Sequence, residues 1–188
     1  AIGRVPAFGL QDTWGAIRPR LRTIVEGRIP RERGRAIDHH SDQINAMANL
    51  LLLIGERAGL PLDSDPVSNV LANLILERLL PWIDKLDLTI VRGDGILSRG
   101  DATRVDRAMM VALAESAQRQ LASAEARVAI LLRAGGRAPA SWDGARMASD
   151  RITELAVKVF GADTLIGEPV TYRQLGEQSV ANAARFGD

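Results

Sequence analysis

The run Asp38-His39-His40-Ser41-Asp42 gathers the side chains of this sequence that are best suited to binding a metal ion. Metal ligands on one helix are usually three or four residues apart, because that spacing places them on the same face. Asp38 and Asp42 have this spacing, but the adjacent His39 and His40 point about 100° apart on a helix. We therefore expect this run to lie on a helix surface, and we predict no metal site.

Other motifs that carry chemistry are missing from the sequence. There is no cysteine, so the chain has no thiol nucleophile, no disulfide and no thiolate metal site. Gly93-Asp94-Gly95 is too short for a phosphate-binding loop and lacks the lysine that should follow. The sequence also lacks a Gly-x-Ser-x-Gly nucleophile elbow.

Positive charge is concentrated near the N-terminus. Residues 1–36 contain eight arginines and only three carboxylates, although the whole chain has a net charge of +1. We predict a basic, irregular segment over residues 1–34, in which Gly15 and Pro19 interrupt any helix. This segment is either a solvated basic face or a contact for an anion. The near-neutral total charge argues against nucleic acid as a partner.

Apolar residues at helical spacing predict helices at 35–58, 66–79, 102–133 and 142–160. Ser64 or Asp65 should cap the second helix, Pro81 should kink or end it, and Asp101 and Ser141 should cap the third and fourth. The third helix has an apolar seam formed by Met110, Leu113, Ala117, Leu121, Ala124, Val128 and Leu131. The short connection after it requires the fourth helix to pack antiparallel against it. A last helical stretch is expected near residues 179–185.

Residues 88–97 predict a short β-hairpin or a tight loop, because apolar residues flank Arg92-Gly93-Asp94-Gly95. We therefore predict an all-α fold, an up-and-down bundle of four to five helices over residues 35–188, with this hairpin inserted. The composition is that of a globular protein, and no apolar run is long enough to cross a membrane. With no signal-peptide pattern and no cysteine, we expect a cytoplasmic location.

Residues 101–188 resemble the helical C-terminal domain of acyl-CoA dehydrogenases. The matching segments are 122–127, Gly136-Arg137-Ala138-Pro139, 145–151, 154–162 and the ending Arg185-Phe186-Gly187-Asp188. The resemblance implies FAD-dependent α,β-dehydrogenation of an acyl-CoA thioester. It also implies that Asp188 is the catalytic base and that the backbone of Gly161 lies beside the flavin.

The β-rich domain that holds the flavin in this family is missing from the sequence, so we expect the chain alone not to retain FAD. The alternative is a non-catalytic helical interaction or assembly protein, such as an oligomer or a virion component. In either case we expect a homo-oligomer or a hetero-oligomer, because the apolar surfaces of residues 44–54 and 67–79 are too wide for one small bundle to hide.

Overall fold

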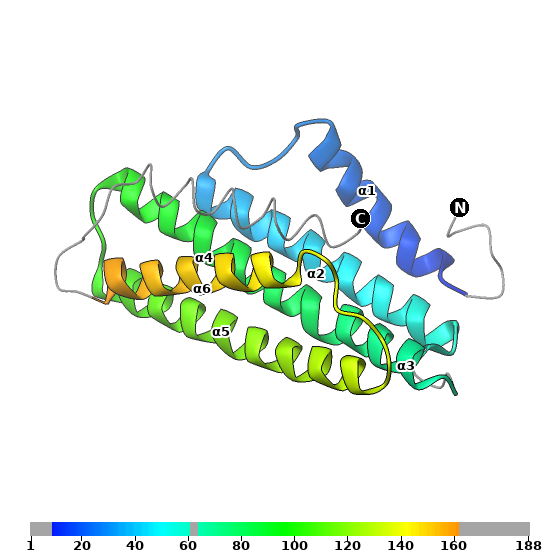
Figure 1. Ribbon diagram of the computed structural model, residues 1–188. Helices are drawn as coiled ribbons and strands as arrows, with labels where there is room; N and C mark the ends of the chain where they lie inside the picture. Colours follow the sequence, from blue (N-terminus) through cyan, green and yellow to red (C-terminus); the bar gives the residue numbers. More distant parts are fainter. Residues whose placement is uncertain (1–8, 61–63, 162–188) are drawn as a thin grey trace. The chain divides into compact units, whose positions relative to one another are not determined.

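The computed structural model describes residues 9–60 and 64–161, and within them all regular structure is helical (Figure 1). The elements are α1 (Gln11–Val25), α2 (Arg33–Arg57), α3 (Pro66–Asn73), the π-helix η4 (Leu74–Leu79), α4 (Leu80–Arg99), α5 (Arg104–Arg133) and α6 (Trp142–Phe160). The all-α prediction is confirmed for these residues. The helical stretch expected near residues 179–185 lies outside the described part of the chain.

Contacts within the chain define two compact units, Ala1–Glu77 and Arg78–Asp188. We call them the N-terminal and the C-terminal unit. The boundary between the two units therefore falls after residue 77. The sequence analysis instead predicted an irregular basic segment up to residue 34 and a helical bundle after it. Across the two described ranges, no helix is both long and apolar enough to cross a membrane.

The segment expected to be irregular contains a regular helix, so that expectation was wrong for residues 11–25. Helix α1 continues through Gly15 and Pro19. Proline inside a helix costs about 3 kcal/mol, because it removes one hydrogen bond and its ring meets the preceding turn. Packing supplies the compensation: Ile17 is buried together with Leu10 and Leu50 of the same unit.

Helix α2 packs against α1 through one part of its wide apolar surface. Leu50 is fully buried, and Met47 and Ile54 pack around it. Ile44 and Leu51, which lie in the same apolar stretch, are exposed. The reason is the unbroken apolar run from Leu50 to Ile54, which offers more than one apolar face to a partner helix.

Helix α3 begins as predicted. The carboxylate of Asp65 accepts a hydrogen bond of 2.8 Å from the backbone N–H of Ser68, and Pro66 occupies the first turn. The chain then changes to the π-helix η4 before α4 begins at Leu80. Pro81 has no N–H to donate, so a regular α-helical bond to the carbonyl four residues earlier cannot form there.

The hairpin predicted for residues 88–97 is not formed, because these residues belong to α4. Gly93 and Gly95 suggested a turn, but both are buried inside the helix. Each glycine costs a helix about 1 kcal/mol relative to alanine. Apolar residues at helical spacing, Leu86, Ile90 and Leu97, are also buried, and their burial outweighs that cost.

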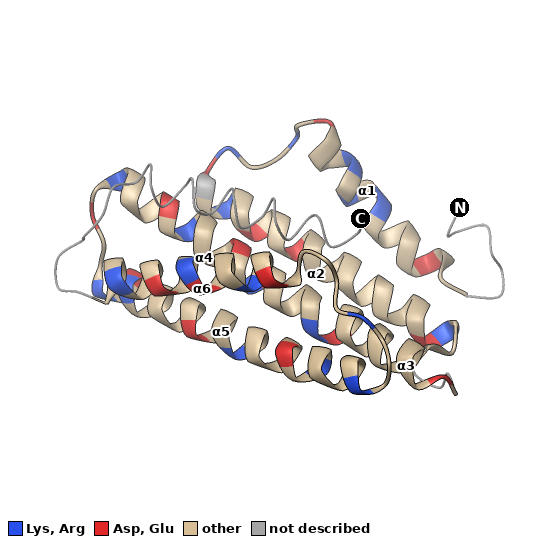
Figure 2. Ribbon diagram, viewed as in Figure 1, with Lys and Arg blue, Asp and Glu red and all other residues tan. Residues whose placement is uncertain are grey.

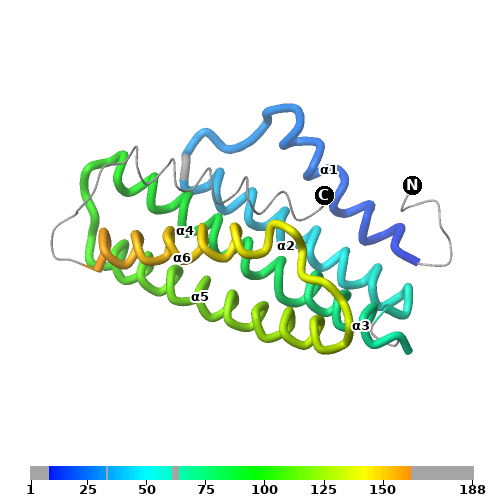
Figure 3. The backbone as a smooth tube through the Cα atoms, viewed as in Figure 1, coloured from blue at the N-terminus to red at the C-terminus, as the bar shows by residue number. Residues whose placement is uncertain are grey.

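Helices α4, α5 and α6 form an up-down-up bundle in the C-terminal unit (Figure 3). One core cluster joins the end of α4, the start of α5 and the end of α6: Ile96, Leu97, Met110, Ala114, Ala156, Val159 and Phe160. This pattern confirms that α5 and α6 are antiparallel neighbours. Helix α5 starts after Thr103, not after Asp101, and Thr103 and Asp106 cap it reciprocally.

Small residues and one polar bridge hold the middle of this bundle. Ala114, Ala117 and Ala124 of α5 and Ala145 and Ala156 of α6 are buried. The indole N–H of Trp82 donates to the hydroxyl of Ser149 over 3.0 Å, and both residues are fully buried. The rings of Trp82 and Trp142 meet edge to face at 5.8 Å.

Candidate functional site

Of the two residues that the resemblance assigns to dehydrogenation, Gly161 lies within the described structure. Asp188 lies outside the described residues. Gly161 ends α6, and its N–H donates to the carbonyl of Val157 over 2.8 Å. A Cβ at this position would lie 2.5 Å from the same carbonyl oxygen. The end of the helix therefore explains a glycine at position 161 without any flavin. The role of Gly161 beside a flavin stays a prediction.

The histidine cluster lies on α2, as its sequence spacing indicated. The rings of His39 and His40 meet edge to face with their centroids 6.3 Å apart. Over residues 9–60 and 64–161, no three histidine, aspartate or glutamate side chains gather closely enough to hold a metal ion.

The arginine-rich segment places its charge on exposed positions of the N-terminal unit. Arg18, Arg20 and Arg22 are exposed on α1. Figure 2 shows the basic positions of this helix in blue. Arg22 pairs with Glu26 at 3.1 Å, and Arg28 pairs with the same glutamate. Among the described residues, Arg18 and Arg20 form no salt bridge. This surface can therefore attract an anion or an acidic side chain.

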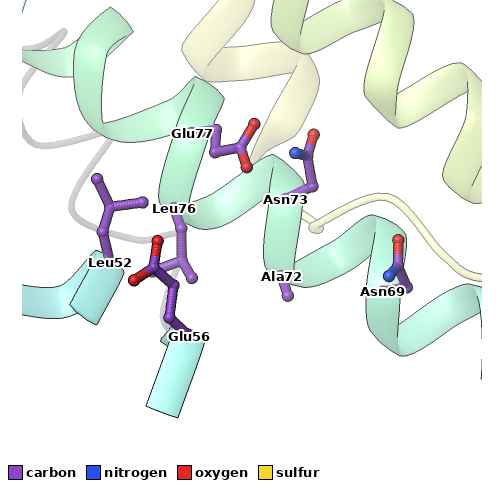
Figure 4. Close-up of a pocket in the computed structure, with 7 residues that line it drawn as sticks. All are labelled: Leu52, Glu56, Asn69, Ala72, Asn73, Leu76 and Glu77. Carbon is purple, nitrogen blue, oxygen red and sulfur yellow. The ribbon is translucent and has the colours of Figure 1, made fainter. Parts of the chain in front are cut away.

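A pocket in the N-terminal unit brings together residues that the sequence analysis did not select. Its volume is about 180 Å³, and it lies between α2 and the α3–η4 segment (Figure 4). Seven residues line it: Leu52, Glu56, Asn69, Ala72, Asn73, Leu76 and Glu77. Two carboxylates and two carboxamides thus share one cavity with three apolar side chains, and no basic residue lines it.

A close approach of two helices forms one wall of this pocket. A Cβ on Gly55 would lie 2.6 Å from a methyl carbon of Leu76, so any larger residue at position 55 would displace that leucine. Gly55 itself is buried. The glycine therefore allows Leu76 to lie against the backbone of α2, next to the pocket-lining Leu52 and Glu56.

Helical spacing gave a signal for the pocket. Leu52 and Glu56 are four residues apart, and Asn69, Ala72, Asn73, Leu76 and Glu77 follow the three-and-four spacing of one helix face. This mixed polar and apolar face looks like an ordinary helix surface in sequence. Only the neighbouring helix makes it concave.

Comparison with known proteins identifies no relative: no family model matches the chain, and neither a curated protein nor a solved structure is similar to it.

Proposed function

We propose that this chain is a non-catalytic helical interaction protein, and that its N-terminal unit associates with a second copy of the chain. The observation that carries this proposal is a set of large apolar side chains left exposed in that unit. Ile44 and Leu51 of α2 are 43% and 39% exposed, and Leu71 of α3 and Ile75 of η4 are 38% and 45% exposed.

The spacing of these side chains favours two apolar stripes over scattered single residues. Ile44 and Leu51 are seven residues apart, which is two helical turns, so they lie on the same face of α2. Gly55, which touches Leu76, continues that face by one further turn. The stripe on α2 thus leads toward the pocket wall, and a partner that covers it would also cover the pocket.

Charge favours a second copy as the partner. The N-terminal unit carries exposed arginines on α1 and a pocket with two glutamates and no basic residue. Surfaces of opposite charge on one chain can pair when two copies associate, and such pairing sets orientation and partner choice. A partner of different sequence would need only one of these two surfaces, either the arginines or the acidic pocket. A second copy uses both.

The resemblance to acyl-CoA dehydrogenases supports a different function, oxidation of an acyl-CoA thioester with FAD. That function stays a prediction, since Asp188 lies outside the described residues and Gly161 is explained by its helix end. The absorbance spectrum of the purified chain with added FAD separates the two proposals. A stoichiometric bound flavin would favour the dehydrogenase.

Sedimentation velocity over a wide range of concentrations tests self-association directly. We expect a concentration-dependent dimer that the double variant Leu51→Gln, Ile75→Gln weakens by roughly tenfold. Full burial of a leucine or isoleucine contributes about 1.5–3 kcal/mol, and association can bury the 39% of Leu51 and the 45% of Ile75 that are still exposed. The matched control is Val105→Gln, Leu132→Gln, which changes two exposed apolar residues of the C-terminal unit.

The control pair should leave the dimer unchanged. Equal weakening by both pairs would assign the contact to no particular surface and would contradict the proposal. A monomeric mass at every concentration would contradict it as well.

A further inference from the structure

The pocket between α2 and α3–η4 combines an apolar wall with carbonyl and carboxylate oxygens. Leu52, Ala72 and Leu76 supply carbon surface, and Glu56 and Glu77 supply negative charge from two different elements (Figure 4). A ligand that matches both must have an aliphatic part and a positive head group. A compact inorganic cation would satisfy only the charged part and would leave the carbon surface without a partner.

Asn73 adds a hydrogen-bond acceptor to this pocket. Its side-chain oxygen is buried, and it accepts no hydrogen bond within the described part of the chain. A buried acceptor without a donor costs about 1–3 kcal/mol, so a ligand with N–H groups would gain by supplying one. Glu56, on the other helix, forms no salt bridge within the same part of the chain.

The pocket volume sets the size of the ligand. A cavity of about 150 Å³ is large enough to hold benzene, whereas drug-sized ligands need about 300 Å³ or more. The volume of about 180 Å³ therefore suits a group of the size of one long side chain.

We propose that this pocket binds an alkyl cation, namely a guanidinium or ammonium group carried on a short aliphatic chain. The guanidinium group fits best, because its planar set of N–H donors can bond two carboxylates or a carboxylate and an amide oxygen at once. This binding does not depend on the proposed self-association. The cation can be a free small molecule or an arginine side chain of a second copy.

Titration of the full chain with agmatine, a guanidinium on a four-carbon chain, tests the pocket. Binding is followed by calorimetry at a protein concentration where sedimentation shows only monomer. We expect saturable one-to-one binding that weakens as salt rises. Butylurea, a neutral analogue of similar shape, should bind at least tenfold more weakly. Equal binding of the two compounds would overturn the proposal, and so would no binding of agmatine.

Variants locate the binding. Glu56→Gln keeps the size of the side chain and removes one charge, so agmatine should bind roughly threefold to tenfold more weakly. Glu154→Gln is the matched control, because Glu154 is an exposed glutamate on α6 in the other unit. Ala72→Leu should abolish binding by filling the cavity without any change of charge. Unchanged binding in both pocket variants, with melting curves like that of the parent chain, would place the site elsewhere.

The origin of the cation is decided by the effect of agmatine on self-association. If agmatine weakens the dimer, the pocket holds an arginine of the second copy. If agmatine binds and the dimer is unaffected, the natural ligand is a free amine or guanidine. Calcium alone is a further probe: calcium binding that Glu56→Gln abolishes, without any agmatine binding, would replace this proposal with a metal site. A strictly monomeric chain that still binds agmatine would contradict only the proposed self-association.

Discussion

The two units of this chain differ in how many apolar side chains each helix buries. In the C-terminal unit, buried residues line all three helices, and the largest fully buried side chains, Trp82 and Phe160, are at most 1% exposed. In the N-terminal unit, α3 has no buried residue at all, and Leu50 is the only large apolar side chain of α2 that is buried. Both units expose some large apolar side chains, among them Ile44 and Leu51 in the N-terminal unit and Val105 and Leu132 in the C-terminal unit. The C-terminal unit has the features of a self-sufficient fold, and the N-terminal unit has those of a surface that needs a partner.

Helices α5 and α2 also differ in how their N-terminal ends are capped. The N-terminal end of α5 is closed by hydrogen bonds in both directions between Thr103 and Asp106. Helix α2 has no side-chain cap and no acidic residue in its first turn, so its first N–H groups lack that support. Local sequence thus reinforces the start of α5 more strongly than it reinforces the start of α2.

The largest effect is expected from Leu121→Asp in the C-terminal unit. Leu121 is 4% exposed, and a charge there would replace an apolar contact and remain unpaired. We expect a loss of about 3–5 kcal/mol in the free energy of unfolding, enough to unfold the bundle. Tryptophan fluorescence in a Trp14→Phe background would report it, since Trp82 and Trp142 then remain. The control Leu132→Asp, at a site 53% exposed in the last turn of the same helix, should cost at most about 1 kcal/mol, from the carboxylate at the negative end of the helix dipole.

A smaller effect is expected at the polar bridge of the same bundle. Ser149→Ala leaves the indole N–H of Trp82 without its acceptor and should cost about 1–3 kcal/mol. Trp82→Phe also removes ring volume, so its loss should be at least as large. The double variant should lose less than the sum of the two, and chemical denaturation of the four proteins measures this. Strict additivity would show that the hydrogen bond contributes nothing.

The cap of α5 gives a pH-dependent prediction. Hydrogen bonds from the backbone N–H and then from the hydroxyl of Thr103 hold the pKa of Asp106 below its ordinary value of 3.8. Because the folded state favours the ionised carboxylate, the stabilisation is complete above about pH 5 and is lost as the pH falls through 3.8 toward the lowered pKa. Thr103→Ala should cost about 1 kcal/mol at pH 7.

The loss of stability in Thr103→Ala should shrink in acid. Asp106 is then protonated in the parent chain as well as in the variant, so the two chains differ less. Melting temperatures of the parent, Thr103→Ala and Asp106→Asn between pH 2 and 7 would test this. Curves that stay parallel over the whole range would contradict the role of the cap.

The smallest effect on folding is expected from Leu51→Gln in the N-terminal unit. An exposed substitution away from special features changes stability by about 0.5 kcal/mol or less. The melting temperature of the dilute protein should therefore hardly move, while self-association weakens. A large loss of stability in the monomer would show that Leu51 belongs to a core, and the contrast between the units would fail.

Sequence pattern predicted the C-terminal unit well where apolar and polar residues alternate cleanly. On α5, every predicted seam residue is buried except Leu113, whose place is taken by its neighbour Ala114. On α6 the bounds are as predicted, and the polar residues Ser149 and Thr153 are buried together with apolar residues of the same helix. Periodicity identifies a helix face to within about one residue, and polar side chains on that face can still be buried when they find partners.

The failures have a common physical cause. Gly93, Gly95 and Pro19 each disfavour a helix locally, and in each case tertiary packing outweighs that preference. On α2 the apolar run is so wide that spacing alone cannot choose the buried side. Helical spacing groups the pocket residues on two helix faces, but the cavity itself depends on Leu76 lying against Gly55, a contact between two helices that spacing within one helix does not predict.

The alanine-rich contact of α5 with its neighbours has a consequence for the response of the fold to temperature. An alanine loses no rotamer entropy on burial, and it also removes less carbon surface from water than leucine does. The heat-capacity change on unfolding follows the apolar area exposed, so we expect a value at or below the usual 12–15 cal/mol/K per residue for this bundle. Its stability curve should then be shallow, changing little between a cold and a warm environment.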